Sequence, residues 1–172
     1  MNLVYRLLLT GNATSWMIII YAIKKDWTLF DIPERLFEVL LLLIPVLLSL
    51  ISIWAAKFLG SDSLHECVEI GLADNEYLPT YLGYFFLSVG VDEKSTIILL
   101  YAVVFLFTFL SQTQYFNPMF MLFGYHYYHI LTPQGTRVFV IAKGKVIRNR
   151  RDISFDNLRR INDTTYLEKR GR

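Results

Sequence analysis

Residues 115–131 read YFNPMFMLFGYHYYHIL, and the architecture of the whole chain depends on how this apolar and aromatic stretch is placed. Pro118 disfavours helix at Asn117, so a helix that arrives from the N-terminal side should end near residue 116. Only about 14 residues remain before Thr132, too few for a relaxed membrane span. The Tyr- and His-rich end of the stretch is typical of a membrane–water interface. We therefore predict an interfacial aromatic segment over residues 117–131.

The sequence after this stretch predicts a small amount of extramembrane structure. Residues 132–135, TPQG, indicate a turn with Pro at its second position, and residues 136–142, TRVFVIA, are β-branched and alternating, as in a strand. The end of the aromatic segment should pair with this strand as a small β-hairpin. Near the C-terminus, Phe155, Leu158 and Ile161 fall on one side of a predicted short helix.

Upstream of residue 115 the composition is that of a membrane protein. Hydrophobic residues make up 54% of the 172 and charged residues 19%, below the roughly 25% of soluble domains. The apolar blocks predict four spans, at about 3–23, 36–58, 78–91 and 96–116, with a polar loop over 60–77. The block at 78–91 is short, so it is either a thinned or tilted span or a re-entrant segment. The fold class expected is an all-α membrane protein, a four-transmembrane-helix bundle with a small cytoplasmic β-hairpin and a short C-terminal helix.

The charge distribution divides the chain into a membrane domain, residues 1–131, and a basic cytoplasmic tail, residues 132–172. The first part holds six Lys and Arg against eleven Asp and Glu, and the tail holds eleven against four. With four spans, most Lys and Arg fall on one side of the membrane, which predicts that both termini are cytoplasmic. The expected location is the bacterial inner membrane.

No catalytic, cofactor-binding or metal-binding motif is present in the sequence, and we expect no enzyme activity. Phosphate-binding glycine loops and the common hydrolase and zinc motifs are absent. The single cysteine, Cys67, excludes an internal disulfide. His126 and His129 lie on or near a predicted strand, where a spacing of three residues points them apart. Packing at the membrane surface is the simpler interpretation of both.

Two groups of polar residues are candidate contact sites. Asn12, Thr14 and Ser15 in the first span are unfavourable against lipid, so this face should line a pore or form hydrogen bonds between helices in an oligomer. The tail carries a basic cluster that could contact anionic lipid, a partner protein or nucleic acid. Positive-inside bias explains most of it, and no direct nucleic-acid binding is expected. The cluster comprises Lys143, Lys145, Arg148, Arg150 and Arg151.

The opening stretch is also a candidate coupling segment between the fourth helix and the tail. Asn117 and Pro118 force a bend, and Gly124 is the next permissive backbone position. Tyr125 then leads from the membrane surface into the hairpin. A change in bilayer thickness would move this segment and the tail with it. The alternative is that Pro118 only ends a helix.

The chain resembles the KwaA family, the membrane subunits of the Kiwa bacterial anti-phage defence system. The resemblance rests on the several spans, on YFNPMFMLFGYHYYHILTPQG (115–135) and on LRRINDTTYLEK (158–169). It implies a four-span homo-oligomer, expected to be a tetramer, with a soluble cytoplasmic partner, KwaB, that binds DNA. It also implies that the membrane subunit detects phage attachment or membrane perturbation and signals inward.

Three functions therefore stand as alternatives. The first is a membrane sensor and scaffold for a cytoplasmic effector, the second a pore-forming effector that depolarises the cell, and the third an accessory membrane subunit of an enzyme. A pore would raise conductance in liposomes, whereas an accessory subunit would copurify with the enzyme it supports.

Overall fold

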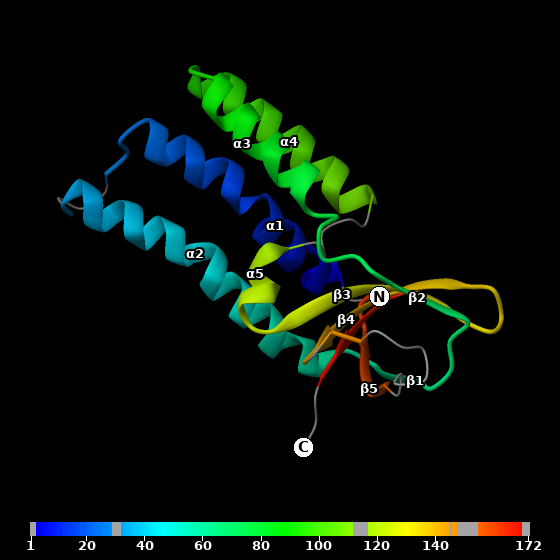
Figure 1. The fold of residues 1–172 in the computed structure, drawn as a ribbon. Helices are drawn as coiled ribbons and strands as arrows, with labels where there is room; N and C mark the ends of the chain where they lie inside the picture. The colour runs from blue at the N-terminus through cyan, green and yellow to red at the C-terminus, as the bar shows by residue number, and fades with distance from the viewer. Residues whose placement is uncertain (1–2, 29–31, 112–116, 145, 148–154, 170–172) are drawn as a thin grey trace. The chain divides into compact units, whose positions relative to one another are not determined.

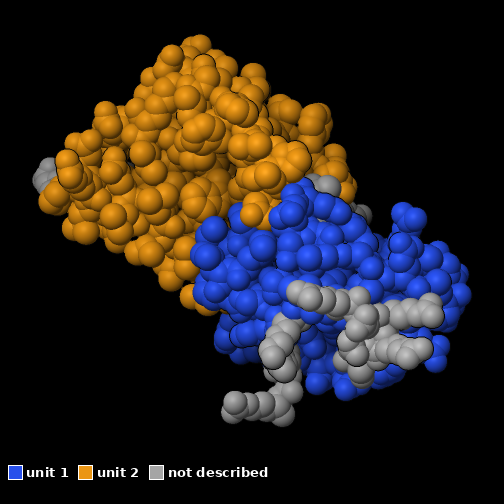
Figure 2. Space-filling model, in the orientation of Figure 1, with its two compact units in different colours: residues 1–5, 52–76, 118–172 blue, residues 6–51, 77–117 orange. Residues whose placement is uncertain are grey.

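The computed structural model describes residues 3–28, 32–111, 117–144, 146–147 and 155–169. The chain divides into two compact units, shown in different colours in Figure 2. A helical unit comprises residues 6–51 and 77–117, and a sheet unit comprises residues 1–5, 52–76 and 118–172. Each unit is thus assembled from segments far apart in the sequence.

The helical unit contains the helices that the apolar blocks predicted (Figure 1). Three of the helices are long and apolar enough to cross a membrane, namely α1, α2 with the 3₁₀ turn that follows it, and α4. The remaining helix, α3, has 13 residues and a length of about 20 Å, short of a hydrocarbon core of about 30 Å. The bounds are α1 (Leu3–Lys24), α2 (Glu34–Ala55), α3 (Leu78–Gly90) and α4 (Lys94–Ser111). The end of α2 and the 3₁₀ turn η1 (Ala56–Phe58) belong to the sheet unit.

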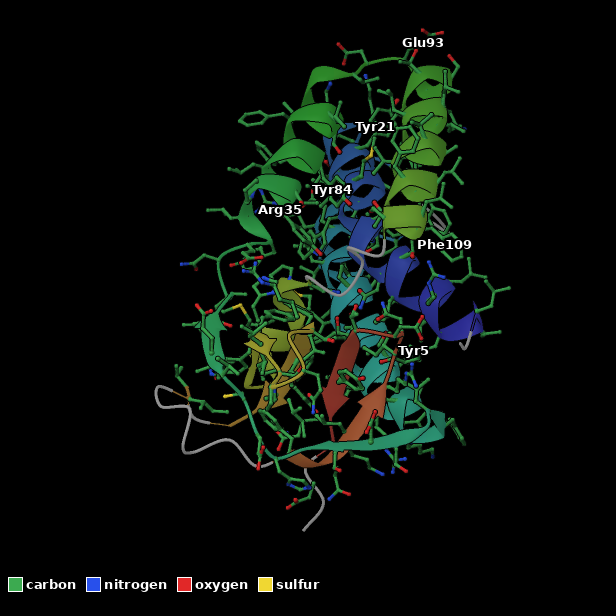
Figure 3. All side chains as sticks on the ribbon, turned by 90° about the vertical axis from the view of Figure 1, so that its right-hand side faces the viewer. Tyr5, Tyr21, Arg35, Tyr84, Glu93 and Phe109 are labelled. Carbon is green, nitrogen blue, oxygen red and sulfur yellow. The ribbon has the colours of Figure 1, made fainter. Side chains whose placement is uncertain are left out.

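Basic side chains at both ends of α1 bind the C-terminal carbonyl groups of other helices. Arg6 donates to the carbonyl oxygen of Phe109 in the last turn of α4, at 2.6 Å, and Phe109 is labelled in Figure 3. Lys24 donates to the carbonyl oxygen of Val89 at the end of α3, at 2.7 Å. A cation at a helix C-terminus satisfies unpaired carbonyls and the helix dipole. These contacts join α1 to α4 at one end and to α3 at the other.

The sheet unit contains one six-stranded mixed sheet of order β1-β5-β6-β4-β3-β2 (Figure 1). Neighbouring strands are antiparallel except for β4 and β6, which are parallel. A short helix, α5 (Pro118–Leu122), precedes the third strand. The strands are β1 (Ser61–Leu64), β2 (Glu69–Leu72), β3 (Tyr125–Leu131), β4 (Arg137–Lys143), β5 (Phe155–Arg160) and β6 (Thr165–Glu168).

The predicted all-α fold class is wrong, because the chain is a mixed α/β protein. The expected hairpin exists as β3 and β4, joined by the TPQG turn, but it forms the middle of a larger sheet. Residues 60–77, predicted to be a polar loop, contribute β1 and β2 at the two edges of that sheet. The predicted division into a membrane domain, residues 1–131, and a cytoplasmic tail, residues 132–172, stays a prediction. The two compact units divide the chain at other residues.

The predicted C-terminal helix is also wrong, since Phe155 and Leu158 belong to strand β5. Leu64 pairs with Phe155 and Asp62 with Leu158, so an extra residue is inserted in β5. Such a β-bulge lets residues three apart face the same side of a sheet. Both side chains are accordingly buried in the core. The i, i+3 spacing that indicated a helix comes from this bulge.

The core of the sheet unit follows the period of two expected of strands. Tyr128 and Ile130 on β3 pack with Val138, Val140 and Ala142 on β4. The Tyr128 hydroxyl accepts a hydrogen bond from the Ile147 amide at 3.0 Å, and burial raises the pKa of Tyr128. The core therefore fixes the end of the aromatic stretch inside a folded sheet.

Candidate coupling site at the asparagine cluster

Three buried polar side chains meet inside the helical unit, and we call them the asparagine cluster: Asn12 of α1, Ser49 of α2 and Asn117. Their exposed fractions are 0%, 0% and 1%. The Ser49 hydroxyl lies 2.9 Å from the Asn12 amide nitrogen and 3.4 Å from that of Asn117. The cluster thus joins two helices to the beginning of the aromatic stretch.

The middle of α2 supplies a further acceptor to the cluster. Ser49 donates to the carbonyl oxygen of Pro45, one turn earlier, at 2.8 Å. Turning the Asn12 amide so that its nitrogen faces this carbonyl oxygen, at 3.2 Å, places its oxygen 2.8 Å from the Asn117 nitrogen. In this orientation both ends of the Asn12 amide are satisfied, as a buried polar group in an apolar bundle requires.

The rest of the polar face of α1 also has partners within the same chain. Thr14 donates to the carbonyl oxygen of Thr10 at 2.8 Å, and its hydroxyl lies 3.4 Å from that of Tyr101 on α4. Ser15 donates to the carbonyl oxygen of Asn12 at 2.7 Å. The role of Asn12, Thr14 and Ser15 in an oligomer or a pore stays a prediction, but their hydrogen bonds are already made inside the chain.

Other buried polar groups in the helical unit are likewise paired between helices. Tyr84 of α3 points toward the neighbouring helices in Figure 3, and its hydroxyl lies 3.2 Å from that of Thr108 on α4. Ser88 of α3 donates to the carbonyl oxygen of Met17 on α1 at 2.8 Å. These bonds fix α3 and α4 against the helix that carries Asn12.

One of the four places where the chain passes between the two units lies between Asn117 and Pro118. Asn117 binds within the helical unit, while Pro118 is the first residue of α5 in the sheet unit. Proline suits a helix start because its missing N–H would be unpaired there. The sequence predicted a bend at this point, and α5 is the structure that follows the bend.

Gly124 ends α5 and turns the chain into β3. Its φ of +75° lies in the left-handed region, where a residue with a Cβ is strained. Its carbonyl oxygen accepts a hydrogen bond from the Gly144 amide at 3.0 Å, which ties the turn to the end of β4. The glycine is therefore required by the backbone conformation at the entrance to the sheet.

Tyr125, the first residue of β3, is buried rather than displayed on the surface. Its ring centroid lies 6.2 Å from that of Phe120 on α5, and the Lys143 ammonium lies 5.6 Å from the ring. Burial, with a smaller effect of Glu168, raises the pKa of Tyr125. Phe120, Tyr125 and Lys143 thus pack α5 onto the hairpin.

The histidines of β3 bind carboxylates of the segment that follows β2. The His126 Nδ1 atom lies 2.7 Å from an Asp74 carboxylate oxygen, whose other oxygen accepts from the Tyr127 amide at 2.8 Å. His129 Nε2 lies 2.9 Å from a Glu76 oxygen. The strand period points the two rings apart, as the spacing predicted. They hold residues 74–76 against β3.

Of the predicted basic cluster, the structure describes Lys143 alone. Its amide donates to a Glu168 carboxylate oxygen at 3.0 Å, at the end of β4. Lys145, Arg148, Arg150 and Arg151 lie outside the described residues. Their contact with lipid or a partner therefore stays a prediction.

Sequence reasoning missed Ser49 and the capping contacts of Arg6, because a linear pattern does not say which helices are neighbours. It also missed a group of carboxylates, Asp26, Glu34 and Glu38, whose oxygen atoms lie within 4.8 Å of one another. Such a group has the oxygen ligands that Mg²⁺ and Ca²⁺ prefer. Exposed acidic groups of this kind are common without a metal.

Comparison with known families decides the identity of the chain. A model of the family described as anti-phage protein KwaA matches residues 5–167, nearly the whole chain. The chain belongs to the KwaA family. Its place in anti-phage defence follows from that membership, and the match spans both the helical unit and the sheet unit of this KwaA-family protein. No curated protein and no solved structure matches the chain significantly.

Proposed function

We propose that this KwaA-family chain is an inner-membrane sensor and scaffold that passes a membrane signal to a cytoplasmic partner. The observation that carries the proposal is the junction at Asn117 and Pro118. Asn117 is hydrogen-bonded to side chains of α1 and α2, and the next residue begins the sheet unit. A displacement of the helices would be transmitted through one peptide bond to α5 and β3.

The sheet topology supports an even number of membrane crossings between residues 72 and 125. Strands β1 and β2 precede α3 and α4, whereas β3 to β6 follow them, yet all six belong to one sheet. Both groups of strands must lie on the same side of the membrane. If α4 crosses, α3 crosses as well, which favours the short span over the re-entrant segment. This argument and the Lys and Arg distribution together support the proposal of four crossings with both termini in the cytoplasm.

A short α3 gives the helical unit a physical means of responding to the bilayer. Its length of about 20 Å must be matched by thinning of the bilayer, at a cost of fractions of a kcal/mol per Å of mismatch. Phage attachment or another membrane perturbation that changes thickness would shift this balance. Ser88 on α3 contacts α1, the helix that holds Asn117 through Asn12. Helix α1 thus contacts both α3, at Met17, and the asparagine cluster, at Asn12.

The partner and the assembly belong to the same proposal. The family resemblance implies a homo-oligomer, which we propose to be a tetramer, and the DNA-binding subunit KwaB as the effector. We propose a scaffold without enzyme activity, because no catalytic arrangement is recognised in the sequence. The pore alternative receives little support, since the polar side chains of α1 are bonded within the chain.

Two measurements on the full-length tagged protein test this function. Copurification in mild detergent should recover the cytoplasmic partner at fixed stoichiometry, and the purified protein in liposomes should not release a trapped dye or dissipate an ion gradient. Dye release that requires the protein would establish the pore. Recovery of an enzyme whose activity falls when this chain is removed would establish the accessory subunit.

A further inference from the structure

The C-terminal end of α2 carries an exposed group of aromatic and basic side chains. Trp54 and Phe58 are 60% and 67% exposed, and their rings meet edge to face with centroids 5.4 Å apart. The Lys57 ammonium lies over both rings, 3.6 Å from the Trp54 centroid and 4.7 Å from that of Phe58. Trp, Phe and Lys in contact are typical of the membrane–water interface.

The length of the helix places this group at the level of the lipid headgroups. The apolar helical segment runs from Glu34 to Phe58, 25 residues, and is about 37 Å long. A hydrocarbon core of about 30 Å accommodates about 20 of these residues. If the segment crosses the membrane, its last turn therefore emerges from the apolar region.

A cavity of about 560 Å³ lies next to this last turn, within the sheet unit. Its walls are residues 58–60, at and after the end of η1, and residues 160–163, at the end of β5 and in the turn that leads to β6. Two hydrogen bonds hold these walls together. Arg159 Nη1 donates to the carbonyl oxygen of Leu59 at 3.1 Å, and the Arg160 amide donates to that of Gly60 at 2.9 Å. The cavity is thus a fixed feature of the fold.

The polar wall of the cavity offers a guanidinium group, which binds an exposed carboxylate and a backbone carbonyl among the described residues. The Arg160 side chain is 51% exposed and lies 2.8 Å from Asp163, whose side chain is 90% exposed. It also donates to the carbonyl oxygen of Asn162 at 3.2 Å. Exposed ion pairs of this kind are weak, so a phosphate can displace Asp163 and form charge-assisted hydrogen bonds.

We propose that this cavity binds the phosphate headgroup of an anionic phospholipid. Arg160 binds the phosphate, and Lys57, whose ammonium lies over the ring of the lining residue Phe58, adds a second positive charge. Trp54 and Phe58 contact the glycerol backbone and the first carbons of the acyl chains. The two cations favour a headgroup with net negative charge over a zwitterionic one, whereas Asp163 competes for Arg160 and weakens this preference.

Quenching of Trp54 fluorescence by brominated lipids tests this proposal on the full-length protein in vesicles. Replacing Trp16 and Trp27 by Phe leaves Trp54 as the single tryptophan. Brominated phosphatidylglycerol should compete with unbrominated phosphatidylcholine with a relative binding constant of about five or more, the factor expected for one added cation near an anionic lipid. The relative binding constant compares the two lipids in the same variant, so a change in the fluorescence intensity of Trp54 caused by the substitution cancels.

Matched variants separate this site from general attraction to a negative surface. Changing Lys57 and Arg160 together to Gln should bring the ratio close to one, Asp163→Asn should raise it, and Arg137→Gln on β4 should leave it unchanged. Native mass spectrometry of the protein with all its tryptophans should show the same order in retained phosphatidylglycerol. The proposal would be overturned if Arg137→Gln reduced the preference for phosphatidylglycerol as much as the Lys57 and Arg160 variant does. It would also be overturned if the Lys57 and Arg160 variant kept the preference unchanged. Removal of the preference by millimolar inorganic phosphate would assign the cavity to a soluble phosphate and overturn the lipid assignment.

Discussion

A double-mutant cycle on Asn12 and Asn117 tests the asparagine cluster directly. Asn12→Ala removes hydrogen bonds to Ser49, Pro45 and Asn117, while Asn117→Ala removes those to Asn12 and Ser49. Hydrogen bonds between membrane helices contribute about 0.6 kcal/mol each on average and at most about 1.7. We therefore expect the free energy of unfolding to fall by about 2 kcal/mol for Asn12→Ala and by about 1 kcal/mol for Asn117→Ala.

The interaction energy between the two sites is the decisive quantity. The double variant should be less destabilised than the sum of the single variants by about 0.6 to 1.7 kcal/mol, because the shared bond is lost only once. Reversible unfolding in mixed detergent micelles, followed by tryptophan fluorescence, measures it. Thr80→Ala, an exposed polar position on α3, serves as the control and should change stability by less than about 0.5 kcal/mol. Strict additivity of Asn12 and Asn117 would refute the direct contact.

Further predictions concern the caps, the turn and a charged loop. Gly124→Ala should lower the free energy of unfolding by about 1 to 2 kcal/mol, since its φ of +75° strains any residue with a Cβ, and thermal unfolding measures this. Arg6→Gln should weaken the cap on α4 and speed hydrogen exchange of the amides in its last turn. Hydrogen bonds from Lys24 and then Lys25 lower the pKa of Asp92 to about 2. Their contribution to stability is present above about pH 4 and is lost as pH falls toward 2, and Lys24→Gln should raise the Asp92 pKa seen by infrared titration.

The helices could be predicted from the sequence because continuous apolar blocks long enough to span a bilayer leave few alternatives. The sheet could not be predicted in full. Strands β1 and β2 have four residues each and no alternating pattern, since they lie at the edges of the sheet and are mostly exposed. Their pairing partners, β5 and β3, come more than 50 residues later. Such edge strands depend on tertiary pairing rather than on local propensity.

The candidate site could be predicted only in part, because its individual residues have local signals but their contacts depend on tertiary structure. The cost of a polar side chain in lipid indicated that Asn12 faces protein, and the Asn-Pro sequence indicated a bend at Asn117. Nothing in the sequence indicated that these two asparagines meet, or that Ser49 lies between them. Neighbour relations between helices depend on packing of the whole bundle. The bulge in β5 explains the helix-like spacing of Phe155 and Leu158. It could not be predicted from the sequence, because it is defined by the pairing of β5 with β1.

The central claim is that the junction at Asn117 and Pro118 transmits a signal from the helices to the sheet unit. The most direct measurement is protection of bacteria against phage by Pro118→Ala at membrane levels matched to the unchanged protein. Alanine restores an N–H and lets α5 extend toward the preceding segment, which alters the junction without removing a side chain of the asparagine cluster. Pro33→Ala, at the start of α2, is the matched control and should protect fully. The account predicts that Pro118→Ala inserts and assembles normally but loses protection, whereas full protection by Pro118→Ala would contradict it.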